Sequence, residues 1–216
     1  EKMRLMSRDA KISVNWDQIK RATNGDLDHL ASSDFDLNAD KPLPRSSYKP
    51  AAVMVPILDA PTGLRVILTR RAAHLKHHPG QIAFPGGKID ATDQSIEHAA
   101  LREAEEEIGL RNLHTDLIGK LPLHRTVTGF EVQPIVARIS PEFLAISDPG
   151  EVEEVFSVPL DHLTNPENYF IEERIWMGKL RRYYVVPFGP YYIWGATARM
   201  LRMFVDRLEH SYETNS

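Results

Sequence analysis

Cysteine is absent from the 216 residues, which excludes a disulfide framework, a cysteine-ligated metal site and thiol catalysis. Positive charge is not in excess either, because 26 Lys and Arg stand against 30 Asp and Glu, a net charge of -4. No broad basic surface for nucleic acid is therefore expected. The longest aliphatic stretch, residues 51–58, contains Pro56 and is far shorter than the roughly 20 residues that cross a membrane. We expect neither nucleic acid nor a membrane as a partner.

The composition that remains is typical of a globular protein, with 42% hydrophobic and 26% charged residues, enough to form a core. The first residues alternate charges without an apolar stretch, so we expect no secretory signal and a cytoplasmic location. Residues 1–48 are polar and are predicted to form a short helix and an extended arm. A domain over residues 49–210 and a tail over residues 211–216 complete the predicted organisation.

Strand and helix patterns interleave in the predicted domain. Residues 51–58 and 64–69 are rich in β-formers and flank a Pro- and Gly-containing turn at 59–63, which predicts a hairpin. Periodicity predicts further strands over residues 81–84, 115–121, 131–139 and 152–158, and helices over residues 94–108 and 197–209. Because there is no regular βαβ spacing and no internal repeat, one α+β or α/β domain is the simplest interpretation.

The helix predicted over residues 94–108 has the clearest signals at its ends. Asp93 is expected to be its N-cap, and Gly109 is expected in the left-handed conformation just beyond its C-terminus. An apolar stripe along the helix would face the core, and it consists of Ala100, Leu101, Ala104 and Ile108.

Three acidic residues, Glu103, Glu106 and Glu107, fall within about 100° on the neighbouring face of this helix. Carboxylates so close together resist ionisation unless a cation neutralises them, and hard oxygen ligands favour Mg²⁺ or Mn²⁺. An acidic triplet alone is more often a solvated helix face. Here Gly86 and Gly87 precede the helix and can bring backbone N–H groups against a ligand, which favours metal and phosphate at one place.

Residues 87–110 resemble the Nudix box, G-x5-E-x7-R-E-U-x-E-E-x-G-U with U aliphatic, and the match is complete from Arg102 onward. The first half is one residue longer than usual, and Asp93 stands where the early Glu is expected. Both departures are similar to those of the coenzyme A pyrophosphatases. Their upstream signature, L-L-T-x-R-[SA]-x3-R-x3-G-x3-F-P-G-G, matches residues 67–87, with isoleucine for the first leucine and Lys76 for the second arginine.

The resemblance implies an α+β Nudix fold, an α/β/α sandwich with a mixed central sheet. It also implies a metal-dependent pyrophosphohydrolase that cleaves coenzyme A or acyl-CoA to 3′,5′-ADP and (acyl-)4′-phosphopantetheine with Mg²⁺ or Mn²⁺. Glu103 and Glu107 are the predicted metal ligands, and Glu106 is a further ligand or the base for the attacking water. Arg102 is expected to pair with Glu106 at i+4 and to orient it.

The substrate is expected to meet a local basic patch, because the net charge of the chain is negative. Arg71 and Lys76, in the basic stretch 70–79, are predicted to bind substrate phosphates, together with the backbone of Gly86 and Gly87. A solvated surface run is the alternative for the stretch.

Two other groups of residues are interpreted as structural and not as part of the site. Glu151, Glu153 and Glu154 are more typical of a solvated turn than of a late-loop acid that assists the water. Five aromatic residues are more typical of a core than of a surface that stacks adenine: Tyr183, Tyr184, Tyr191, Tyr192 and Trp194.

Two alternative functions stay open. The first is a Nudix hydrolase of another nucleoside diphosphate, such as ADP-ribose or a dinucleoside polyphosphate. The second is a non-catalytic module that only binds a nucleotide, against which the complete glutamate set argues. The expected partner is a small molecule in each case, and a homodimer is left open because sequence does not determine the oligomeric state.

Overall fold

The computed structural model describes residues 14–25, 27, 30–38 and 42–213. Within them, a mixed nine-stranded sheet forms the centre, with strand order β1-β7-β8-β2-β3-β4, while β5, β6 and β9 pair with β2, β8 and β3. The strands are β1 (Ser32–Ser33), β2 (Lys49–Ala60), β3 (Gly63–Arg71), β4 (Ile82–Ala83), β5 (Gly86–Lys88), β6 (Thr115–Lys120), β7 (His124–Arg125), β8 (Phe130–Ile139) and β9 (Val152–Pro159).

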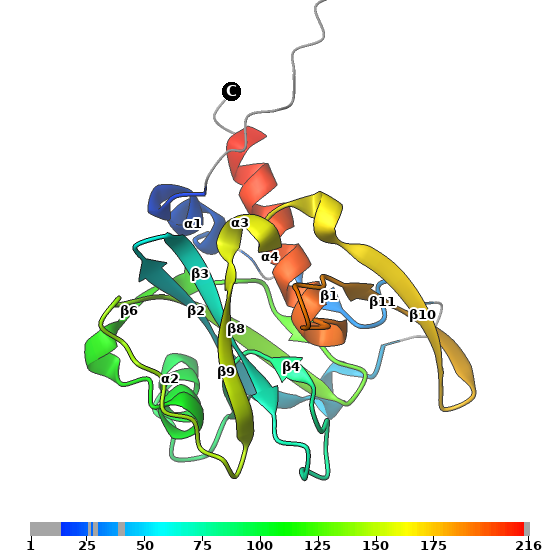
Figure 1. The fold of residues 1–216 in the computed structure, drawn as a ribbon. Helices are drawn as coiled ribbons and strands as arrows, with labels where there is room; N and C mark the ends of the chain where they lie inside the picture. The colour runs from blue at the N-terminus through cyan, green and yellow to red at the C-terminus, as the bar shows by residue number, and fades with distance from the viewer. Residues whose placement is uncertain (1–13, 26, 28–29, 39–41, 214–216) are drawn as a thin grey trace, which may run out of the picture.

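Helices cover both faces of this sheet (Figure 1). Successive residues of β2 enter two different cores. Val55 packs with α1 (Trp16–Thr23) and α4 (Gly195–Glu213). Met54 packs with α2 (Ile96–Ile108) on the other face. A strand that is buried on both faces is apolar along most of its length, as β2 is. The structure thus confirms the predicted α+β sandwich with a mixed sheet.

The ends of α2 confirm one prediction and correct another. Gly109 has φ 70° and lies in the left-handed region, and its N–H donates to the carbonyls of Ala104 and Glu105, as a C-terminal glycine does. The predicted N-cap was wrong: α2 begins at Ile96, and the Ser95 hydroxyl accepts the cap hydrogen bond from the backbone of His98 at 3.1 Å. The carboxylate of Asp93 is engaged elsewhere, with Arg102.

A hairpin that the sequence pattern did not predict follows the sheet. Strands β10 (Phe170–Trp176) and β11 (Lys179–Val185) form a two-stranded antiparallel sheet of their own, which projects from the body of the protein (Figure 1). Met177 and Gly178 connect them, and both have positive φ, 49° and 74°, as the two central residues of a type I′ turn require. The pattern gave no signal because Met is unusual in such a turn and most residues of both strands are exposed.

Two elements within residues 1–48, α1 and β1, pack against the rest of the chain. Ile19 and Ala22 of α1 are buried in the core that α4 also enters, and β1 pairs in parallel with β7. Residues 1–13 and 39–41 of the predicted arm, and residues 214–216 of the predicted tail, lie outside the described residues. Helix α4 is longer than predicted at both ends. None of the described helices has the length and apolar character that crossing a membrane needs.

Candidate active site

The turn that carries Gly86 and Gly87 lies directly against α2. The backbone N–H of Gly86 donates to Oε2 of Glu107 at 3.1 Å. A Cβ atom added to Gly87 would lie 2.6 Å from the Oε1 of Glu103, so only glycine fits without displacing that carboxylate. The two glycines therefore bring the carboxylates of Glu103 and Glu107 against one short stretch of backbone.

Burial sets the electrostatics of these two carboxylates. Glu107 is only 3% exposed, and this burial raises its pKa to about 8, although the Gly86 N–H and Arg71 act in the opposite direction. Burial also raises the pKa of Glu103, against the hydrogen bond from Arg102. The charge of Glu103 also raises the pKa of Glu107, but less than burial does. At neutral pH such a pair favours binding a proton or a cation.

Arg102 organises the polar side of α2. Its Nε and Nη2 donate to the two carboxylate oxygens of Asp93, both at 3.0 Å, while Nη1 donates to Glu103 at 3.0 Å and to Glu106 at 3.2 Å. The pair with Glu106 that the sequence predicts is thus present. The hydrogen bonds from Arg102 hold the pKa of Asp93 well below its ordinary value. Asp93 fixes the guanidinium by a bidentate contact, which is a stronger restraint than the predicted helix cap.

The three glutamates of α2 share a face, as predicted, but not an environment. We call Glu103, Glu106 and Glu107 the acidic face. Glu103 and Glu107 lie against the glycine turn, whereas the Glu106 side chain is 61% exposed and turned to Arg102. Within the described ranges, no group of three or more His, Asp or Glu side chains is arranged to hold a metal ion as it stands. The pair of Glu103 and Glu107 nevertheless fits a divalent cation, because hard carboxylate oxygens with raised pKa values gain most from neutralisation.

Glu151 is a fourth acid near this pair, for which the sequence favoured a solvated turn. It is exposed, yet its charge raises the pKa of both Glu103 and Glu107. Its backbone carbonyl accepts a hydrogen bond from Ala72 at 2.8 Å, which ties the start of β9 to the end of β3. A periodic pattern cannot reveal this residue, since it reaches α2 only through the pairing of β3 with β9.

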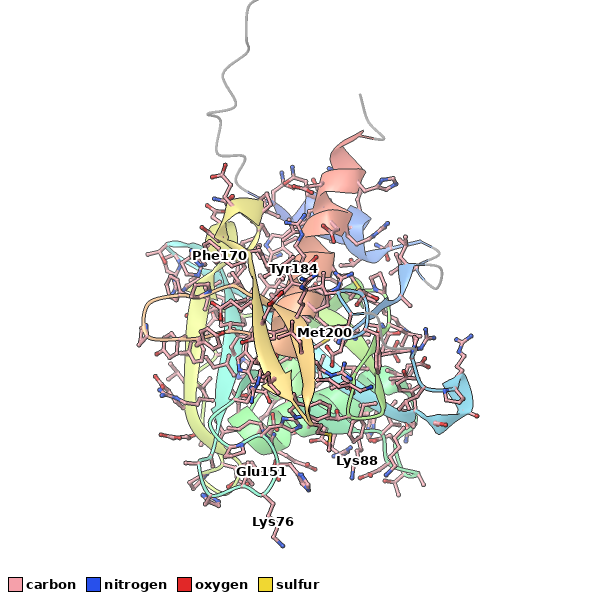
Figure 2. The ribbon with its side chains drawn as sticks, turned by 90° about the vertical axis from the view of Figure 1, so that its right-hand side faces the viewer. Lys76, Lys88, Glu151, Phe170, Tyr184 and Met200 are labelled. Carbon is pink, nitrogen blue, oxygen red and sulfur yellow. The ribbon has the colours of Figure 1, made fainter. Side chains whose placement is uncertain are left out.

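Of the two basic side chains that are predicted to bind phosphate, the structure brings one, Arg71, to the acidic face. Nη1 of Arg71 lies 3.9 Å from Oε1 of Glu107. Lys76 is exposed in the connection between β3 and β4, and Figure 2 shows its side chain pointing away from the protein. Lys76 does not line the adjacent cavity, whereas Arg71 does.

That cavity has a volume of about 650 Å³ and extends from Arg71 to the β10–β11 hairpin. Among the described residues it is lined by one carboxylate, that of Asp34, and by five arginines, namely Arg71, Arg174, Arg181, Arg182 and Arg199. Aromatic side chains form much of the remaining wall, including Phe84, Trp176, Tyr183, Tyr184 and Trp194. An anionic ligand with a flat ring is the kind of molecule that such a lining binds.

Sequence reasoning assigned the aromatic residues to a core and passed over the hairpin arginines. Tyr183 and Trp194 contact each other edge to face, with ring centroids 5.2 Å apart, and both line the cavity. Tyr191 does lie in a packed environment, stacked on Phe156 at 3.6 Å. The interpretation thus fits some of these residues and not others. The available signal was the presence of three arginines and three aromatic residues within residues 174–184.

One wall of the cavity comes from the N-terminal part of the chain. The buried His124 forms a hydrogen bond at each of its ring nitrogens. Nδ1 lies 2.8 Å from the hydroxyl of Ser32, and Nε2 lies 3.1 Å from the carboxylate of Asp34. The hydrogen-bonded group of Ser32, His124 and Asp34 resembles a catalytic triad in composition. However, Ser32 is only 2% exposed, so a substrate has no access to its hydroxyl. The cluster holds the residues beside β1 in place as a wall of the cavity.

Known proteins are similar to this chain in sequence. The NUDIX domain model matches residues 48–178. The chain is 38% identical over 177 residues to the proteins named "Uncharacterized Nudix hydrolase NudL" from Salmonella typhimurium and Salmonella typhi, which covers 82% of this chain and 91% of each relative. A solved Nudix hydrolase from M. smegmatis, RenU, is 21% identical, with a TM-score of 0.49 over 78% of this chain and 88% of that one. Since the domain match covers more than half of the chain and the curated relatives align over most of it, the chain belongs to the Nudix hydrolase family.

Proposed function

We propose that the protein is a metal-dependent pyrophosphatase that cleaves the diphosphate of coenzyme A or an acyl-CoA, releasing 3′,5′-ADP and (acyl-)4′-phosphopantetheine. The observation that carries this proposal is the junction of the acidic face with a basic, aromatic cavity at Arg71, which contacts Glu107 and lines the cavity. Nudix hydrolases generally need divalent metal ions, and we propose Mg²⁺ or Mn²⁺ here. A diphosphate bound at this junction would have metal on one side and cationic side chains on the other.

The upstream signature of residues 67–87 supports coenzyme A over other nucleoside diphosphates. Its one chemically important departure, Lys76, is exposed and lies outside the lining of the cavity. Replacing the planar fork of an arginine there therefore leaves the charge of the cavity wall unchanged. Arg71, the signature residue that lines the cavity, is retained and can contact two phosphate oxygens at once.

In the proposed mechanism, Glu103 and Glu107 would hold the metal ion, which when bound neutralises the diphosphate oxygens and activates water. Arg102, clamped by Asp93, holds Glu103 and Glu106 in position. Glu106 is the exposed member and is proposed to take the proton of the attacking water at its carboxylate. Arg71 would orient the diphosphate as the P–O bond of the bridge breaks.

The experiment that tests this proposal is a substrate panel with Mg²⁺ and with Mn²⁺, in which the products are identified by mass. We expect coenzyme A to yield 3′,5′-ADP and 4′-phosphopantetheine at a rate well above those of ADP-ribose and diadenosine polyphosphates. A rate that is highest on one of the latter would contradict the substrate. Tight nucleotide binding with no metal-dependent product would contradict the enzyme and favour a binding module.

A further inference from the structure

The β10–β11 hairpin presents two arginines to the cavity. In the antiparallel register Arg174 lies directly opposite Arg181, so their side chains share a face of the hairpin. Both line the cavity. We call Arg174, Trp176, Arg181 and Tyr183 the hairpin wall. Two guanidinium groups at one rung place positive charge on the face of the hairpin that lines the cavity, and such a face attracts an anion.

Two other arginines that line the cavity, Arg182 and Arg199, form ion pairs with carboxylates. The neighbouring rung pairs Glu173 with Arg182, and these opposite charges form an ion pair at 2.6 Å. Arg199 likewise contacts a carboxylate, that of Asp36, at 2.9 Å. Arg182 and Arg199 are therefore already neutralised by carboxylates and are not part of the subsite proposed below.

Aromatic rings hold both guanidinium groups in the hairpin wall. The guanidinium of Arg174 lies 5.1 Å from the ring centre of Trp194, and that of Arg181 lies 5.3 Å from Trp176 and 5.5 Å from Phe35. Stacking uses the flat face of a guanidinium, whereas its N–H edge binds phosphate oxygens in bidentate fashion. An arginine already stacked loses less conformational entropy when it binds an anion.

Side chains from elsewhere in the chain fix the hairpin at the cavity. The Oδ1 of Asn38 accepts from the backbone N–H of Arg182 at 2.9 Å, and its Nδ2 donates to the backbone carbonyl of Arg182 at 3.1 Å. On the other strand, the Tyr192 hydroxyl donates to the Glu172 carboxylate at 2.6 Å. The position of the two arginines is therefore set before any ligand binds.

We propose that Arg174 and Arg181 form a second phosphate subsite, which binds a phosphomonoester of the substrate separate from the diphosphate. The inference rests on the proposed function, which places the diphosphate at Arg71 and the acidic face. The hairpin wall belongs to the same cavity and is formed by other elements. A phosphate on the ribose of an adenine nucleotide could then reach the hairpin wall, and the subsite would select nucleotides that carry it.

Binding of product-like nucleotides tests the subsite without requiring turnover. Calorimetry would compare adenosine 3′,5′-bisphosphate with AMP, which lacks only the 3′-phosphate, on the wild type and on the Arg174→Gln, Arg181→Gln double variant. We expect the wild type to bind the bisphosphate about 10-fold to 100-fold more tightly, as for charge-assisted hydrogen bonds. In the double variant we expect this preference to fall to about 2-fold or less, since the bidentate contacts are gone.

The matched control is Arg138→Gln. Arg138 also stands on a strand, lies 5.0 Å from the ring centre of Trp16 and pairs with a carboxylate, that of Asp59, but it does not line the cavity. This variant should keep the preference of the wild type. Equal affinities in the wild type, a preference that survives in the double variant, or its loss in Arg138→Gln would each overturn the subsite.

The melting temperature is a second measurement, and it shows whether each variant is folded. Arg174 is exposed, so Arg174→Gln alone should leave the melting temperature of the free protein nearly unchanged while it weakens the phosphate preference. Arg174→Lys keeps the charge but lacks the planar guanidinium. Its phosphate preference should therefore lie between those of the wild type and Arg174→Gln. A melting temperature and a preference that fall together would indicate a structural role and overturn the subsite.

The phosphate subsite and the proposed hydrolase activity can fail independently, and the experiments distinguish the two failures. Hydrolysis of coenzyme A with equal rates on 3′-dephospho-coenzyme A would overturn the subsite and leave the activity standing. Loss of the bisphosphate preference in the double variant, without hydrolysis of coenzyme A, would support the subsite and contradict the activity. Adenosine 2′,5′-bisphosphate completes the series: tighter binding than the 3′,5′ isomer supports a phosphomonoester subsite for a different nucleotide.

Discussion

The acidic face and the hairpin wall carry opposite charges, yet each of them holds like charges together. The buried Glu107 and the half-buried Glu103 lie against one glycine turn. Arg174 and Arg181 stand opposite each other in a strand pair. Holding the two carboxylates together costs free energy in the free protein. Each region favours a ligand of the opposite sign, which is a cation for the acidic face and, in our proposal, a phosphate for the hairpin wall. Functional sites commonly retain such locally unfavourable arrangements.

The two regions also differ in how the chain assembles them. The acidic face belongs to one helix and one preceding turn, so its members lie within a short stretch of sequence. The cavity that contains the hairpin wall has walls from residues 33–38, residues 174–184 and residues 194–200. Substitutions in the acidic face should therefore abolish catalysis, and substitutions in the hairpin wall should change selectivity.

The largest effect is expected from Glu107→Gln. Loss of the buried carboxylate should remove a metal ligand and lower kcat at least a hundredfold, about 3 kcal/mol in barrier or more. The same change should leave the metal-free protein as stable or more stable, because an unfavourable buried charge is gone. Turnover with saturating Mg²⁺ and thermal unfolding with EDTA measure the two effects. Glu105→Gln, an exposed neighbour on α2, should change neither, and near-normal turnover of Glu107→Gln would contradict the assignment.

An intermediate effect is expected from Asp93→Asn. The variant keeps the size of the side chain but removes the charge that clamps Arg102 through two hydrogen bonds of 3.0 Å. Glu103 and Glu106 would then be less well oriented, and kcat should fall about 10-fold with little change in KM. Asp90→Asn is the matched control, because Asp90 lies 3.7 Å from the same guanidinium and is exposed. An equal loss in both variants would show that general charge, and not the clamp, is responsible.

Metal should stabilise the protein by an amount that grows with pH. The pKa of Glu107 rises from 4.5 to about 8 on burial, so between these values the folded state binds more protons than the unfolded state. The free energy of unfolding of the metal-free protein therefore falls as pH rises through this window and levels off above it. Because Mg²⁺ and the proton compete for this carboxylate, the stabilisation by Mg²⁺ should be larger at pH 8.5 than at pH 6.

Thermal unfolding with and without Mg²⁺ measures this difference. At a concentration of about 100 times Kd, bound metal adds about 2.7 kcal/mol, or roughly 5–10 °C for a domain of this size. In Glu107→Gln the increase should be smaller and should depend less on pH across the window, because only Glu103 of the pair then exchanges a proton for the metal. An increase of the same size in the variant would place the metal elsewhere and would break the comparison between the two charged regions.

The sequence predicted the acidic face better than the cavity, for a physical reason. Helical periodicity places Glu103 and Glu107 on one face wherever the helix lies, and Gly109 ends it by its own conformational preference. The bond between Asp93 and Arg102 spans nine residues across the start of α2, which periodicity does not describe. The hairpin was missed because its strands are largely exposed, so that packing and the Met177 turn, not alternation, define it.

The smallest effect is expected from Lys76→Ala, which separates a motif position from a cavity position. Lys76 and Arg71 belong to one signature and one basic stretch, but only Arg71 lines the cavity and contacts Glu107. A solvated charge outside the site contributes little to binding, because water and salt screen it. We therefore expect Lys76→Ala to raise the KM for coenzyme A less than about 2-fold, and Arg71→Ala to lower kcat/KM more than about 10-fold. An increase in KM for Lys76→Ala that matches the effect of Arg71→Ala would mean that the connection between β3 and β4 folds over the substrate, and that the basic surface extends beyond the cavity to include this connection.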